Sequence, residues 1–411
     1  YIFSLLKDYQ SALADITKAL ELDPKFPLAY LNRGNIRNSQ GESRLALSDY
    51  DKTIELDSSF IAAYYNRGVI HRTLGNTSEA ITSFNKVIEI DPNYFDAFFN
   101  RGLVFDLLDE SQLALSDYSK AIELNSRNVS ALVNRGVRYA KMGDNQSAIL
   151  DYNKAIGINP KMIAAYFNRA RSKQELNDIE SAINVYNMSL ELNSDHVSAY
   201  YFRGLAHQQL GNYRAAIIDF TKTLERKPNF VDAYLNRGVA HKNLGDYQFS
   251  LIDHNKAIEL DSTIAFASMS RGSTHYKLGD YQSAILDQTK AIQLDPKIVE
   301  AYFNRALANY SRGEFQMAIT DLNIAIEINQ KFEDAYLIRG SAYLSLGNKK
   351  QAMSDYNKII ELNPLYAPAY HNRGIVYLHL GNKKSACQDW KKAKELGHIE
   401  AASMIEKHCK K

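Results

Sequence analysis

Residues 27–60 read PLAYLNRGNIRNSQGESRLALSDYDKTIELDSSF, and a similar stretch begins at every 34th residue as far as residue 400. The most regular feature is an arginine followed by glycine or alanine: Arg33, Arg67, Arg101, Arg135, Arg169, Arg203, Arg237, Arg271, Arg305, Arg339 and Arg373. No insertion or deletion interrupts this spacing. A fixed period of this length predicts a stack of similar supersecondary units, each burying its apolar face on its neighbours.

Each stretch predicts a helical hairpin, because apolar and small residues follow helical spacing before and after residue 41. The turn slot holds residue types that tolerate left-handed backbone: Gly41, Gly75, Asp109, Gly143, Asn177, Gly211, Gly245, Gly279, Gly313, Gly347 and Gly381. Gly34 and Ala46 lack bulk, so the two helices should cross closely. We therefore expect an all-α chain: part of a repeat at 1–26, eleven units in one continuous solenoid over 27–400, and a capping helix at 401–411.

Composition narrows the class of protein. The 411 residues carry 49 Lys and Arg against 47 Asp and Glu, a net charge of +2, which gives no broad cationic surface for nucleic acid. No apolar run is long enough to span a membrane, and the first residues resemble no signal peptide. With only Cys387 and Cys409, we expect neither a disulfide framework nor a paired-cysteine metal site. These features fit a soluble protein of a reducing, cytoplasmic compartment.

The order Ala-Tyr-x-Asn-Arg-Gly, Leu-Gly-Asp-Tyr and Ala-Ile-x-Asp-Tyr-x-Lys-Ala-Ile-Glu-Leu-Asp-Pro resembles the tetratricopeptide repeat over essentially the whole chain. The Asn-Arg-Gly form is similar to that of long bacterial, especially cyanobacterial, members of the family. The resemblance implies a right-handed superhelical solenoid of 34-residue hairpins. It also implies a concave groove, lined by the first helix of each hairpin, that binds peptides.

Aspartates form a second column with the same period: Asp15, Asp49, Asp117, Asp151, Asp219, Asp253, Asp287, Asp321, Asp355 and Asp389. All except Asp15 lie sixteen residues after an arginine of the first column. Ser83 and Val185 interrupt the aspartate column. A guanidinium can bind a carboxylate with two parallel hydrogen bonds, which avoids an unpaired charge in a partly buried place. We expect a pair within each hairpin, such as Arg33 with Asp49. The alternative is a row of free arginines that binds acidic ligands.

Asparagines stand directly before many of the arginines, and we call them the asparagine row: Asn32, Asn66, Asn100, Asn134, Asn168, Asn236, Asn304 and Asn372. A carboxamide both donates and accepts, so the row could pair with the backbone of an extended peptide. It resembles the asparagine ladder in the tetratricopeptide arm of the O-linked N-acetylglucosamine transferases. Neighbouring apolar residues are candidates for additional peptide contacts: Tyr65, Phe99, Phe167, Val69 and Leu103. The alternatives are that asparagine is simply common in this slot and that the aromatic residues pack between hairpins.

The sequence contains no motif for catalysis or for a cofactor: it has no phosphate-binding loop, zinc-protease helix or nucleophile elbow. A column of histidines, His71, His207, His241 and His275, should be too widely spaced to share one metal ion, so we expect no metal site. In the capping helix, Ile399, Ala402, Ile405 and Cys409 should form the inner face. Unusual residues such as Ser268 and Ser270 mark the repeat at 265–298 as a possible weak point.

Two functional hypotheses remain. The first is a non-catalytic scaffold that holds extended peptide segments of a partner protein. The second is the substrate-recruiting arm of a larger enzyme, because the chain begins within a repeat and without methionine. End-to-end self-association through the incomplete first repeat is a further possibility.

Overall fold

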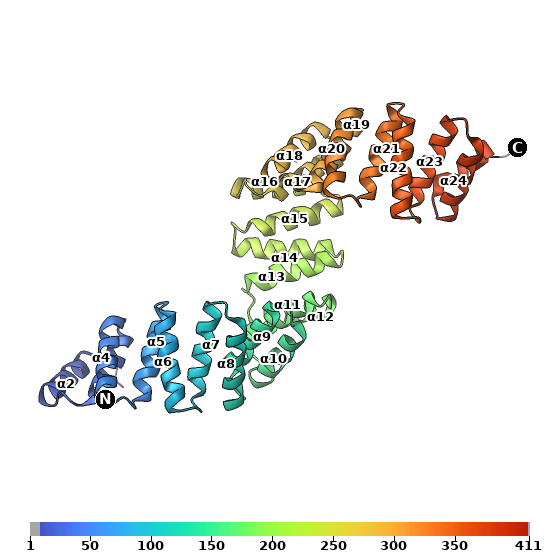
Figure 1. Ribbon diagram of the computed structural model, residues 1–411. Helices are drawn as coiled ribbons and strands as arrows, with labels where there is room; N and C mark the ends of the chain where they lie inside the picture. Colours follow the sequence, from blue (N-terminus) through green and yellow to red (C-terminus); the bar gives the residue numbers. More distant parts are fainter. Residues whose placement is uncertain (1–8, 410–411) are drawn as a thin grey trace. The chain divides into compact units, whose positions relative to one another are not determined.

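The computed structural model describes residues 9–409, and all of its regular structure is helical. The parts of the notional first repeat and of the capping helix at 1–8 and 410–411 lie outside the described residues. Contacts between residues group the chain into two compact units, Tyr1–Ala206 and His207–Lys411. In each unit, helices pair into hairpins, and each hairpin packs against the next (Figure 1).

Each first helix is followed by a second helix one residue longer in most hairpins. The first unit contains α2 (Tyr9–Leu22), α3 (Pro27–Ser39), α4 (Ser43–Leu56), α5 (Ile61–Thr73), α6 (Thr77–Ile90), α7 (Phe95–Leu107), α8 (Ser111–Leu124), α9 (Val129–Lys141), α10 (Asn145–Ile158), α11 (Ile163–Glu175) and α12 (Ile179–Leu192), and α13 (Val197–Gln209) extends past its boundary. The second contains α14 (Tyr213–Arg226), α15 (Val231–Leu244), α16 (Tyr247–Leu260), α17 (Ala265–Lys277), α18 (Tyr281–Leu294), α19 (Val299–Ser311), α20 (Phe315–Ile328), α21 (Glu333–Ser345), α22 (Lys349–Leu362), α23 (Ala367–His379), α24 (Lys383–Glu395) and α25 (Ile399–Cys409).

The turn between the two helices of a hairpin requires a left-handed residue, as the sequence predicts. Gly41 has a φ of +83°, and the two exceptions to glycine, Asp109 and Asn177, also have positive φ values of 56° and 60°. The close crossing predicted at Gly34 is confirmed, because a Cβ atom there would lie 2.7 Å from Cε1 of Tyr50. Ala46 and Tyr50 are fully buried at this crossing.

The arginine and aspartate columns pair within the hairpins. In a representative pair, Arg305 donates from Nε to Oδ2 of Asp321 at 2.9 Å and from Nη2 to Oδ1 at 2.7 Å. The same pairing joins Arg33 to Asp49, Arg101 to Asp117, Arg135 to Asp151, Arg237 to Asp253, Arg271 to Asp287, Arg339 to Asp355 and Arg373 to Asp389. Burial raises the pKa of Asp117, while the hydrogen bond from Arg101 acts in the opposite direction. The structural prediction is confirmed, and the alternative of a free arginine row is wrong for these pairs.

Most arginines of the column also bind the second helix of the preceding hairpin, a contact that was not predicted from the sequence. Nη1 of Arg305 donates to Oγ1 of Thr289 at 3.0 Å. Equivalent bonds join Arg67 to Asp51, Arg101 to Asn85, Arg135 to Ser119, Arg169 to Asn153, Arg203 to Asn187, Arg237 to Thr221, Arg271 to Asn255, Arg339 to Asn323 and Arg373 to Asn357. The guanidiniums of Arg101, Arg135, Arg237, Arg271, Arg305, Arg339 and Arg373 therefore join two neighbouring hairpins as well as the two helices of their own.

Arg138 is an additional buried arginine in a slot where other repeats have Ile36, Val104 or a small residue. Its side chain is 2% exposed. Its Nε donates to Oδ1 of Asp106 at 2.7 Å, and its Nη1 donates to Asp109 and Ser111. Asp106 also accepts a hydrogen bond from the hydroxyl of Tyr118. This cluster links α9 to the preceding hairpin, α7 and α8.

The core around α16 to α18 is unusually polar. His254 and Gln288 are buried where other hairpins have aromatic residues such as Tyr50, and Ser268 and Ser270 are buried beside them. Nε2 of His254 and Oε1 of Gln288 have no hydrogen-bond partner. Unsatisfied buried polar groups lower stability, so the weak point expected at 265–298 remains a prediction with a physical basis.

We predict that acid selectively destabilises this region through His254. Burial, and after it the charge of Lys242, lowers the pKa of His254 to about 3. The unfolded state therefore binds a proton below its ordinary pKa near 6.5, and the folded state does not. Lowering the pH from 7 to 5 should then cost about 2 kcal/mol of unfolding free energy from this group.

The measurement is hydrogen exchange of α16 and α17 at pH 7 and pH 5 in the wild type and in His254→Tyr, after correction for the intrinsic exchange rate. Tyrosine restores the residue type found at Tyr50 and Tyr118. Between pH 7 and pH 5, the unfolding free energy of the variant should fall by about 2 kcal/mol less than that of the wild type. An equal fall in both proteins would mean that His254 binds a proton as readily in the folded state as in the unfolded state.

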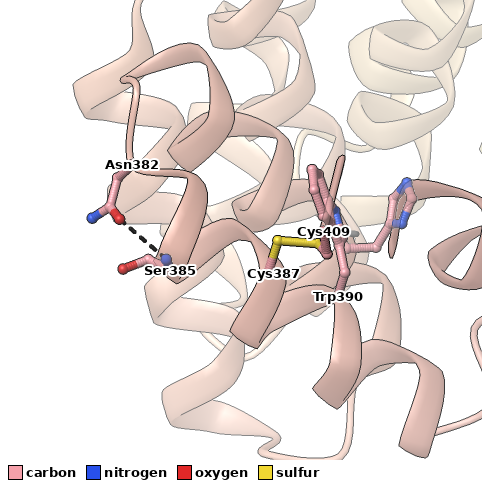
Figure 2. The surroundings of a disulfide bond; sticks show 6 residues. Asn382, Ser385, Cys387, Trp390 and Cys409 are labelled. Atoms are coloured by element: carbon pink, nitrogen blue, oxygen red, sulfur yellow. Dashed lines mark hydrogen bonds between the residues drawn. A yellow bond between two sulfur atoms is a disulfide. The ribbon is translucent and has the colours of Figure 1, made fainter. Parts of the chain in front are cut away.

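The C-terminal end differs from the sequence-based expectation. Cys387 on α24 and Cys409 on α25 form a disulfide with a Cα–Cα distance of 5.7 Å, next to Trp390 (Figure 2). The expectation that the cysteines do not pair is wrong, because α25 packs against α24, the helix directly before it, and brings together two cysteines that are 22 positions apart. The bond also removes the sequence argument for a reducing compartment, since stable disulfides are typical of oxidising ones.

The inner face of the capping helix was also predicted incorrectly in part. Ile399 is 90% exposed and Ala402 is exposed, whereas Ala401 is fully buried. Ile405 and Cys409 pack against the core of the last hairpin, as predicted. The helix begins at Ile399 rather than at residue 401, and the side that packs on α24 includes Ala401 instead of Ile399 and Ala402. No helix among residues 9–409 is both long and apolar enough to cross a membrane.

Candidate functional site

The asparagine row lies on the first helices, as predicted. Asn32, Asn66, Asn100, Asn134 and Asn168 occupy α3, α5, α7, α9 and α11 of the first unit, and Asn236, Asn304 and Asn372 occupy α15, α19 and α23 of the second. Some consecutive first helices contact each other directly: α3 contacts α5, α5 contacts α7, and α9 contacts α11. The first helices of the first unit thus form a shared face, which we call the first-helix face.

Two asparagines of the row are engaged inside the protein. Asn66 donates from Nδ2 to Oδ1 of Asn35 on the neighbouring α3 at 2.8 Å. Asn100, which is 7% exposed, donates to the hydroxyl of Tyr65 at 3.1 Å and to the carbonyl of Asp96 at 2.9 Å. The bonds to Asn35 and to Tyr65 join adjacent hairpins, so the carboxamides of Asn66 and Asn100 have a structural role.

The other members of the row are half-buried, and several have internal bonds of their own. Asn236 donates to the carbonyl of Asp232 at 2.8 Å. Burial raises the pKa of Tyr356 to about 12, and hydrogen bonds from Ser341 and Asn372 act in the opposite direction. Asn32, Asn134, Asn168 and Asn304 keep part of their surface exposed.

The three predicted aromatic residues pack between hairpins while leaving part of each ring exposed. Tyr65 lies 5.2 Å from Tyr94 between ring centroids. Phe99 lies 6.0 Å from Tyr118 of its own hairpin and packs against a cluster that contains Ala131 of the next hairpin, and Phe167 lies 4.9 Å from His196. The packing alternative therefore describes most of their surface. Val69 and Leu103, one turn beyond the row, are half-buried on α5 and α7.

A cavity of about 290 Å³ lies on the first-helix face of the first unit, among α9, α10 and α11. Its lining consists of Val137, Ala140, Lys141, Gly143, Asn145, Tyr152, Asn168, Arg171, Ser172 and Glu175. Asn168 is the member of the row that reaches it. Two cations and one carboxylate, with two carboxamides and an apolar wall, give the cavity a mixed surface with an excess of positive charge.

Arg171, which lines the cavity, lies outside the column of arginines that recurs every 34 residues, and within the described residues its guanidinium is not bound to a carboxylate. Its guanidinium lies 4.6 Å from the ring centroid of Phe202, a cation–π contact that leaves its hydrogen-bond donors available. Within residues 9–409 it forms no salt bridge and no hydrogen bond through its side chain. Arg171 was not among the predicted site residues, although it is the only charged residue in a column that otherwise holds Asn35, Val69, Leu103 and similar residues.

Comparisons with known proteins agree on one family. Models described as "Tetratricopeptide repeat" together match most of the chain, at residues 1–26, 61–94, 129–162, 168–235, 231–264, 269–335, 333–364 and 355–388. No curated protein matches the chain significantly.

Among solved structures, MamA is 30% identical over 40% of this chain and 96% of its own, with a TM-score of 0.38. YrrB, "a TPR protein with an unusual peptide-binding site", is 23% identical over 46% of this chain and 97% of its own, with a TM-score of 0.40. The Cut9–Hcn1 assembly is 14% identical over 99% of this chain and 94% of its own, with a TM-score of 0.51. The last likeness shows the all-helical array of paired hairpins.

Proposed function

The chain belongs to the tetratricopeptide-repeat family, and we propose that it is a non-catalytic scaffold that holds an extended, acidic segment of a partner protein on the first-helix face. Proteins of this family generally serve as scaffolds for protein interaction. The observation that carries the finer proposal is the cavity at α9 to α11, where Arg171 has an unpaired guanidinium beside Asn168. A carboxylate of the ligand would supply the missing partner of Arg171.

Because Asn66 and Asn100 already form internal hydrogen bonds, we place the centre of the proposed site at α9 and α11 and not at α5 and α7. A peptide would have to replace these bonds, so it would gain little net free energy there. Asn134 and Asn168 lie on α9 and α11, which contact each other, and are better placed to pair with a peptide backbone. The exposed edges of Tyr65, Phe99 and Phe167, with Val69 and Leu103, extend the proposed contacts along the row, and Asn32 lies at its start.

Hydrogen bonds from the asparagine carboxamides alone do not supply the binding free energy of a micromolar complex. Two asparagines contribute about 1 kcal/mol for each net hydrogen bond, and a hydrogen bond to a charged group contributes about 1.5–3 kcal/mol. A micromolar complex needs about 8 kcal/mol after the peptide has been ordered. Apolar side chains of the ligand must therefore occupy the Val137 and Ala140 wall of the cavity. In the second unit, Asn236, Asn304 and Asn372 are proposed as secondary contacts.

We predict that Arg171→Ala weakens binding of acidic peptides about tenfold to a hundredfold, because it removes the charged donor. The probe is a set of peptides selected on the wild-type protein from a random library and measured by fluorescence anisotropy. Asn168→Ala should weaken the same peptides about fivefold.

The matched control is Lys154→Ala, which removes one exposed cation from α10 outside the cavity. It should leave the affinity within twofold. If Lys154→Ala and Arg171→Ala weakened binding equally, the effect would be one of net charge, and the cavity would not be the binding site.

A further inference from the structure

Three side chains that no repeat pattern predicts lie together at the last hairpin. His371 lies on α23, His398 immediately precedes α25, and Glu400 lies in the first turn of α25. One potential ligand atom from each residue lies within 4.8 Å of the other two. We propose that these residues bind one divalent transition metal ion, with Zn²⁺ as the best-fitting ion, and that the ion clamps α25 to α23.

Neither imidazole forms a hydrogen bond within the described residues, and the polar contact that His371 does make is with Glu400. Their rings stack with centroids 4.3 Å apart and an angle of 16° between planes. Nδ1 of each ring is buried without a hydrogen bond, and His371 is only 6% exposed. Within the described part of the chain, no nitrogen of either ring forms a hydrogen bond. Buried polar atoms are nearly always satisfied, so this arrangement is unusual. Because no hydrogen bond fixes a proton on either ring, each neutral imidazole can offer a nitrogen lone pair to a metal ion.

The donor set selects the class of ion. Two imidazoles and a carboxylate suit Zn²⁺ and related first-row metals, whereas Ca²⁺ and Mg²⁺ prefer sites made of oxygen atoms. Three protein ligands leave a fourth tetrahedral position for water. The cysteines of this region are already joined in the disulfide, so no thiolate competes for the ion.

The required movement is small. Nε2 of His371 lies 3.8 Å from Oε2 of Glu400, whose side chain is 79% exposed and free to rotate. Ligand atoms of a tetrahedral Zn²⁺ site lie about 3.3 Å apart, from metal–ligand distances of about 2.0–2.1 Å. His398 follows Gly397, whose φ of +91° is a left-handed conformation outside any helix. Side-chain rotation of Glu400 and His398 can therefore bring the ligands into range while His371 stays fixed in the core.

The site would hold α25 independently of the disulfide. Within the described structure, α25 packs on α24 through Ala401 and is tied to it by Cys409. His371, by contrast, belongs to α23, the first helix of the last hairpin. An ion bound by His371, His398 and Glu400 would thus connect α25 to the other helix of the hairpin.

The test is titration of the full chain with Zn²⁺ by calorimetry, supported by the visible absorption of Co²⁺ as a report of tetrahedral coordination. We expect one ion per chain at this site. His371→Leu should weaken binding at least tenfold, and it should still fold because leucine holds the same slot at Leu31, Leu235 and Leu337. Glu400→Gln, at an exposed position, should also weaken binding without changing the metal-free protein.

His379→Ala is the matched control, because His379 is an exposed histidine on the same helix. It should bind as the wild type does. Zn²⁺ should also slow hydrogen exchange in α25 of the wild type and not in His371→Leu. The proposal is overturned if the wild type binds no Zn²⁺, or if His371→Leu and Glu400→Gln bind it with unchanged affinity.

Discussion

Asp106→Ala should lower the unfolding free energy of the α7 to α9 region by about 3 kcal/mol, the lower end of the cost of breaking a buried ion pair from one side. The substitution leaves the buried guanidinium of Arg138 without its Nε acceptor and the buried hydroxyl of Tyr118 without its acceptor. Asp109 and Ser111 still bind Nη1 of Arg138, which keeps the cost from being larger. Hydrogen exchange of α7 to α9 would measure the local change.

Two further variants separate the buried charge from the general effect of mutation. Asp109→Gly removes a carboxylate that is 89% exposed and places glycine at a residue with positive φ, so its effect should stay below about 1 kcal/mol. Asp106→Ala combined with Arg138→Val should recover most of the loss, because valine is the residue of Val104 in this slot and no buried charge remains. A double variant as unstable as Asp106→Ala alone would contradict this explanation.

Reduction of the disulfide between Cys387 and Cys409 should destabilise α25 by about 3 kcal/mol, as expected from the chain entropy of a closed loop of this length. The two residues are separated by 22 positions. Hydrogen exchange of α25 with and without reductant would measure the effect. Cys409→Ser should reproduce the reduced protein and show no further response to reductant. Free thiols in protein purified without reductant would show that the bond does not form.

Much of the fold could be predicted because the same small, turn and charged residues recur at the same positions of nearly every 34-residue unit. The slots of Gly34 and Gly41 recur in every unit, so one helical hairpin explains them all. The pairing of Arg305 with Asp321 could likewise be inferred from two charge columns with a fixed offset. Periodic features of this kind predict structure well because each unit meets the same neighbours.

The features that the sequence analysis missed are those that occur once. Arg138 replaces an apolar residue in a single hairpin, and its partners Asp106 and Asp109 have no counterpart elsewhere. Cys387 and Cys409 lie on different helices and at different repeat positions, so their pairing depends on how α25 folds back. The engagement of Asn100 by Tyr65 was also not predictable, because it depends on the distance between two first helices.

We propose that the first-helix face at α9 to α11 binds an extended acidic peptide. Its most direct test is photo-cross-linking of a selected peptide that carries a benzophenone beside its acidic residue, followed by mass spectrometry of the adducts. We expect cross-links to Val137, Lys141 and neighbouring residues of α9 and α11, and their loss in Arg171→Ala. Cross-links confined to the exposed surfaces of second helices that do not line the cavity, such as α6 and α12, and unaffected by Arg171→Ala, would contradict this proposal.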